Sequence, residues 1–124
     1  MKSLLKITAV VETLTGVALV ASPSLLISVL MGASLEGSGA LMVARITGFA
    51  LLTLAIACWQ SRNNENAKAI LQAMLFYNVT IAILLVYCIF GEKFSGIGLW
   101  PVFILHIILA VWCGLSLQQQ KEKN

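Results

Sequence analysis

Four apolar stretches of the sequence each contain a polar side chain that could do chemistry. These side chains are Glu12, Arg45, Asn78 (with Tyr77 beside it) and His106. A carboxylate and a guanidinium can pair through two parallel N–H···O bonds, and an imidazole can exchange a proton near neutral pH. Brought together away from water, such groups could bind a small polar or amphipathic ligand, or could fix the register of the helices.

The depths of these residues predict that they meet. Counted at 1.5 Å per residue from the ends expected to face outward, Arg45 and His106 lie about 10 Å deep, Glu12 about 15 Å and Asn78 about 18 Å. Inserting an Arg or Asp at a helix centre costs roughly 2.5–3.5 kcal/mol. Pairing Glu12 with Arg45 would remove much of that cost. We therefore expect this ion pair, inside a polar cluster that also holds Tyr77, Asn78 and His106.

The elements that position these residues are four apolar segments. They cover about residues 4–21, 39–60, 67–90 and 99–117. Each is near the length that an α-helix needs to cross about 30 Å of hydrocarbon, and none has the alternation of a barrel strand. The composition, 60% hydrophobic and 10% charged, is that of a membrane protein. The sequence predicts an all-α membrane protein, a single-domain four-transmembrane-helix bundle over residues 1–124.

The first segment could instead be a cleaved signal peptide, because Lys2 and Lys6 precede it and small residues stand near Val20-Ala21-Ser22. Glu12 would then lie in the apolar core of that peptide, where a charge is unfavourable. We expect the segment to be retained as the first helix.

A short helix is predicted between the first two spans, over about residues 23–31. Ser22 and Pro23 suit its start and Gly32 suits its end. At about 13 Å it is too short to cross the membrane. It would lie at the membrane interface, the interpretation we favour, or fold back as a lid over the bundle. A ligand pocket would then open outward beneath it.

Charge distribution predicts the orientation. Six basic residues fall on the side of the termini, namely Lys2, Lys6, Arg62, Lys68, Lys121 and Lys123, and Lys93 is on the other side. Cytoplasmic ends carry the excess of Lys and Arg, so both termini should be cytoplasmic, with residues 61–66 as a cytoplasmic turn.

Several chemistries are disfavoured by the residues present. The three cysteines, Cys58, Cys88 and Cys113, are far apart, and one histidine offers no second ligand. No nucleophile–base–orienter set can be recognised. The net charge of +3 is scattered along the chain. We therefore expect no metal site, no cofactor, no catalytic residue and no nucleic-acid partner, and favour a binding or accessory module over an enzyme. Membrane lipids are the expected partners, and a homo-oligomer is left open.

Two families resemble parts of the chain. The pattern ETLTGVALVASPSLLISVLMG followed by VARITGFALLTLAIACW, with Pro23, Gly32, Arg45 and Gly48 as landmarks, resembles the DoxX-like small bacterial membrane proteins. That resemblance covers the first half of the chain and implies a four-helix bundle of the bacterial inner membrane. It transfers no activity.

AVVETLTG is similar in outline to the first helix of small multidrug resistance transporters, and implies a proton-coupled transporter with Glu12 as the coupling carboxylate. The aromatic-rich pattern of that family is missing, and Arg45 would oppose cationic substrates. This transporter is the alternative to the binding module. A third alternative is that the Glu12–Arg45 pair serves only as scaffold.

Overall fold

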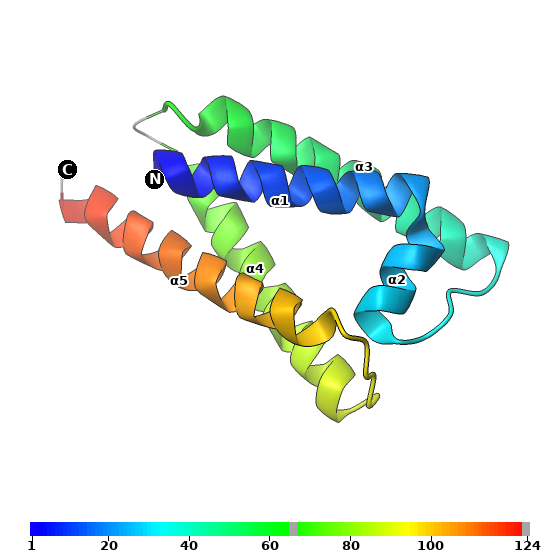
Figure 1. The fold of residues 1–124 in the computed structure, drawn as a ribbon. Coiled ribbons are helices and arrows are strands. Elements are labelled where there is room, and N and C mark those ends of the chain that lie inside the picture. Colours follow the sequence, from blue (N-terminus) through cyan, green and yellow to red (C-terminus); the bar gives the residue numbers. More distant parts are fainter. Residues whose placement is uncertain (65–66, 123–124) are drawn as a thin grey trace.

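A computed structural model describes residues 1–64 and 67–122, which form five α-helices and no strand (Figure 1). The helices are α1 (Lys2–Ala21), α2 (Pro23–Met31), α3 (Ser38–Ser61), α4 (Lys68–Phe90) and α5 (Leu99–Glu122). The all-helical prediction is confirmed. Residues 65–66 of the predicted turn, and Lys123 of the predicted cytoplasmic charges, lie outside the described residues.

Four of the helices, α1, α3, α4 and α5, are long and apolar enough to cross a membrane. Only 22–39% of the most apolar stretch of each is buried inside the protein. Large apolar side chains point outward instead: Leu14 is 67% exposed, Phe76 75% and Ile83 64%. Apolar surface of this extent is not stable in water. The chain is therefore a multi-pass membrane protein.

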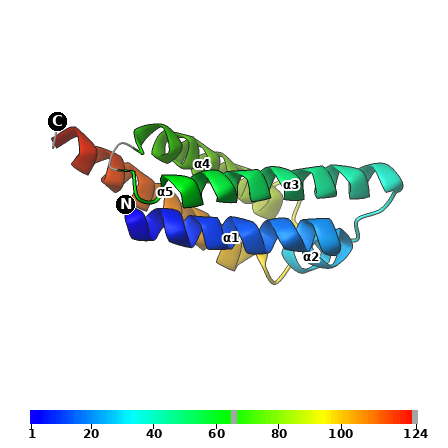
Figure 2. The ribbon, with the colours of Figure 1, turned by 90° about the horizontal axis from the view of Figure 1, so that it is seen from above.

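The four long helices form two antiparallel pairs. α1 packs on α3 and α4 packs on α5, while few contacts join one pair to the other. The pairs meet near the two termini and diverge toward the opposite end (Figures 1 and 2). Side chains from all four helices fill the core where they meet, including Leu5, Cys58, Leu71 and Leu109. The four long helices thus pack together at one end, and the two pairs separate toward the other.

Glycines set the close approach of α1 to α3. A Cβ added at Gly16 would lie 2.8 Å from the Gly48 carbonyl oxygen, and one added at Gly48 would lie 2.8 Å from the Gly16 carbonyl oxygen. Ala44 and Gly48 are buried and belong to the row of small residues that permits such contact between membrane helices. This crossing fixes the register of the two helices.

The short helix α2 lies at the diverging end, between the two pairs (Figure 1). Its predicted bounds are confirmed, with Pro23 in the first turn and Gly32 at the C-cap with φ +68°, a conformation that favours glycine. Ser22 takes the N-cap position without a side-chain capping bond. The Gly98 N–H donates to the Val29 carbonyl oxygen at 3.0 Å, which ties α2 to the segment before α5.

Candidate functional site

Glu12 projects from α1 into the protein and is 2% exposed. The helix buries it because Leu5, Ala9, Glu12, Gly16 and Leu19 recur at intervals of three or four residues and so share one face. The Tyr77 hydroxyl, from α4, donates a long hydrogen bond of 3.4 Å to Glu12 Oε2. This hydrogen bond therefore links α1 of one helix pair to α4 of the other.

Asn78 and His106 link α4 to α5. Asn78 Nδ2 donates to the Met74 carbonyl oxygen at 2.7 Å, and Asn78 Oδ1 lies 2.8 Å from His106 Nδ1. An amide oxygen only accepts hydrogen bonds, so His106 Nδ1 must carry a proton. The His106 ring also packs edge-on against Tyr77, with 5.7 Å between ring centroids. Asn78 thus orients His106 and leaves Nε2 for another partner.

Three of the predicted site residues, Glu12, Tyr77 and His106, border a small, largely enclosed cavity of about 90 Å³ beneath α2, whereas Asn78 does not line it. Glu12, Tyr77 and His106 supply its polar wall, together with Thr15. Leu26 and Leu30 of α2 close it from the diverging end of the bundle. The remaining lining is apolar and comes from Val11, Val102 and Leu105. Leu26 and Leu30 of α2 thus cover a cavity that lies beneath residues 22–32, and this cavity is largely enclosed where the sequence predicted a pocket that opens outward.

One residue of this polar wall has an oxygen without a hydrogen-bond partner. Within the described residues, Glu12 Oε1 is buried and has no partner; Thr8 Oγ1, which does not line the cavity, is buried without one as well. A buried carboxylate oxygen without a donor costs about 1–3 kcal/mol, which a ligand with a donor group would offset. In the same part of the chain, no three His, Cys, Asp or Glu side chains gather as metal ligands would. The arrangement suits hydrogen bonding to a small molecule.

Arg45 is not part of the site. The predicted ion pair with Glu12 is wrong, because Arg45 is exposed on the outer surface of α3. Glu12 precedes Gly16 by four residues and Arg45 precedes Gly48 by three, in helices that run in opposite directions. The two side chains are therefore offset by seven residues, about 10 Å along the axis. Arg45 also lies about 100° around the helix from Ala44, which faces α1.

The exposed position of Arg45 is tolerable near the end of a span. Arg45 lies about 10 Å from the start of α3 at Ser38. Its long side chain can extend along the helix and bring the guanidinium toward the headgroup region. This lowers the free-energy cost of placing in the membrane a cation that has no ion-pair partner among the described residues.

The structure brings together four of the five predicted site residues, Glu12, Tyr77, Asn78 and His106. The sequence prediction did not include Thr8, a fully buried polar residue one turn before Glu12 on the same face of α1, which does not itself line the cavity. The spacing of four residues was a signal that could have found it. It also missed Leu26 and Leu30, because their contribution depends on where α2 folds.

Comparisons of the chain with protein-family models, with curated proteins and with solved structures found no match. The resemblances to DoxX-like proteins and to small multidrug resistance transporters stay predictions.

Proposed function

We propose that this protein is a binding module of the bacterial inner membrane that holds a small amine-bearing molecule in the cavity beneath α2. The observation that supports this most directly is the Glu12 carboxylate, 2% exposed, with one oxygen unpartnered beside an enclosed space. Lone buried carboxylates are costly, and inside membranes such groups usually serve a site.

The chemistry of the cavity wall favours an amine over an anion. Glu12, Tyr77 and Thr15 line the cavity and carry oxygens that can accept hydrogen bonds, and His106 Nε2 can accept one when the ring is neutral. Because Arg45 lies outside, no guanidinium is present to attract an anionic group. The volume of about 90 Å³ suits a ligand of a few heavy atoms, well below the 300–1,000 Å³ of drug-sized sites.

Methylammonium is the probe that tests the proposal. In detergent-purified protein, methylammonium chloride should raise the midpoint of thermal unfolding relative to equal concentrations of KCl, because a ligand of the folded state stabilises it. Glu12→Gln should abolish the difference. Glu92→Gln, which alters an exposed carboxylate, is the matched control and should keep it. An unchanged midpoint in the wild type, or the same rise in Glu12→Gln, would refute an amine site at Glu12.

A proton-coupled transporter is the second candidate. Two observations favour it: the cavity lies where two weakly joined helix pairs meet, and Arg45 does not face the cavity. Rocking of one pair against the other would expose such a site alternately to the two sides. Uptake of methylammonium into proteoliposomes under a pH gradient separates the candidates. A binding module binds the probe without uptake.

Both termini are proposed to lie in the cytoplasm, on the evidence of the basic residues at that end. Ser34 and Ser95 are exposed at the opposite end. In a protein whose native cysteines have been replaced, the single variants Ser34→Cys and Ser95→Cys should react with an impermeant maleimide applied to intact cells. Asn63→Cys, exposed at the terminal end, should react only after the membrane is permeabilised. The reverse labelling pattern would invert the topology and leave the cavity chemistry untouched.

A further inference from the structure

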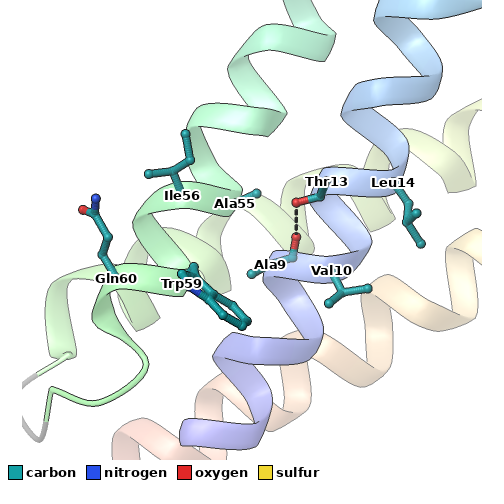
Figure 3. Close-up of a pocket in the computed structure, with 8 residues that line it drawn as sticks. All are labelled: Ala9, Val10, Thr13, Leu14, Ala55, Ile56, Trp59 and Gln60. Carbon is teal, nitrogen blue, oxygen red and sulfur yellow. Dashed lines mark hydrogen bonds between the residues drawn. The ribbon is translucent and has the colours of Figure 1, made fainter.

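A second hollow lies on the outside of the protein, between α1 and α3 (Figure 3). Its volume is about 430 Å³, and it is lined by four residues of α1 from Ala9 to Leu14 and four of α3 from Ala55 to Gln60. Trp59 extends from α3 toward α1 and forms one wall (Figure 3). The Thr13 hydroxyl is already bonded to the Ala9 carbonyl oxygen at 2.7 Å, so it leaves the groove apolar. A groove of this kind fits a stretch of acyl chain.

Basic groups stand at the end of the groove nearest the termini. Lys6 is exposed and lies one turn before Val10, on the same face of α1. Arg62 stacks over the Trp59 ring, 4.0 Å from its centroid, and its Nη1 donates to the Trp59 carbonyl oxygen. The stacking holds the guanidinium beside the groove while most of its five N–H donors remain for a ligand. The apolar groove thus ends at two cations held near the depth of the headgroups.

We infer that this groove binds an anionic phospholipid, with one acyl chain between α1 and α3 and the phosphate group against Lys6 and Arg62. Basic clusters at the ends of membrane helices select such lipids. A second copy of the chain suits the groove less well. Two copies of fixed topology related by a two-fold axis would bring their Lys6 and Arg62 side chains together, and like charges oppose that contact. This inference is independent of the cavity beneath α2.

The test compares dioleoyl phosphatidylglycerol with dioleoyl phosphatidylcholine, which share acyl chains and differ in headgroup charge. Native mass spectrometry of the detergent-purified protein should give a tighter apparent affinity for phosphatidylglycerol. The double variant Lys6→Gln/Arg62→Gln should weaken phosphatidylglycerol binding roughly tenfold to thirtyfold, since each basic residue near an anionic lipid contributes about a factor of five. Lys93→Gln, at the opposite end, is the charge control and should leave the affinity unchanged.

Two valines on one face of α1 provide a matched pair of variants that tests the acyl-chain part of the site. Val10 and Val17 are 53% and 52% exposed and share a face of α1, but only Val10 lines the groove. Val10→Trp should fill the groove and weaken binding of both lipids, and Val17→Trp should bind as the wild type does. Equal wild-type affinity for the two lipids, or equal losses in the matched variants, would overturn the inference. A dimer that Val10→Trp dissociates and that excludes lipid would assign the groove to a second copy instead. If Val10→Trp loses helicity, Leu14→Trp provides the same test.

Discussion

Replacing Gly48 by alanine is expected to lower the free energy of unfolding by about 1–3 kcal/mol, because the added methyl group would force α1 and α3 apart. It would lie 2.8 Å from the Gly16 carbonyl oxygen and 2.8 Å from Val20 Cγ2. The first of these is a backbone atom, so a change of rotamer cannot relieve the clash. Because this crossing sets the position of α1, the variant should also disturb the burial of Glu12.

The control for this prediction is the same substitution at Gly114, within α5. A Cβ there meets nothing within 4 Å. Gly114→Ala should therefore raise the free energy of unfolding by up to about 1 kcal/mol, the ordinary benefit of alanine over glycine inside a helix. Unfolding in mixed micelles with increasing SDS, followed by circular dichroism, measures both changes.

The partner glycine adds a second check. Gly16→Ala alone should cost about as much as Gly48→Ala, since its Cβ would lie 2.8 Å from the Gly48 carbonyl oxygen. The double variant should cost less than the sum of the two, because helices already separated by one methyl group have room for the other. Equal effects at Gly48 and Gly114 would show that the crossing is looser than its geometry implies.

Local features of the sequence were enough to predict the helices. Apolar runs of membrane-spanning length mark α1, α3, α4 and α5, and their bounds differ from the predicted ones by a few residues, except where α5 continues to Glu122. Pro23 and Gly32 predicted α2 because each imposes a backbone conformation that suits one end of a helix. None of these inferences needs information about neighbouring helices. The pairing of α1 with α3 and of α4 with α5 does need it.

The depth of the residues in the polar cluster could be predicted from the sequence, but the side of the helix on which each residue lies could be predicted only in part. Glu12, Asn78 and His106 have similar depths, and each lies on the buried stripe of its own helix. The depth predicted for Arg45 was similar as well, but the contact of Gly48 with Gly16 places Arg45 about 10 Å from Glu12 along the axis, on another face of α3 from Ala44 and Gly48. The row of small residues correctly predicted a close contact, and that contact turns Arg45 away from α1. Depth counted from the predicted helix ends could not distinguish these cases, because it omits both the register of the paired helices and the angle around each helix axis.

Replacing Glu12 by methionine is expected to separate the stability of the fold from the function of the cavity. Methionine is unbranched like glutamate and carries no group that needs a hydrogen-bond donor. In the wild type, Oε1 is unpartnered and Oε2 accepts only the 3.4 Å bond from Tyr77. Removing this poorly paired carboxyl should raise the free energy of unfolding by about 1–3 kcal/mol. The same change should abolish the thermal stabilisation by methylammonium.

Arg45→Met is the matched control, since it also replaces a charge within a span by methionine. Arg45 is exposed and distant from the cavity, so methylammonium should stabilise this variant as it stabilises the wild type. SDS-titrated unfolding and thermal midpoints with methylammonium or KCl, measured on both variants, give the comparison.

The opposite result for Glu12→Met would be equally informative. If the variant unfolds more easily than the wild type, the carboxyl contributes to the fold through Tyr77, and Glu12 is scaffold. If the variant is more stable than the wild type and no longer binds methylammonium, Glu12 belongs to a binding site. Proteins retain a destabilising side chain where function requires it, and here the destabilising atom would be the one that contacts the ligand. Because Glu12 Oε1 is buried beside the cavity and the partner predicted for it lies on another face of α3, we expect the second outcome.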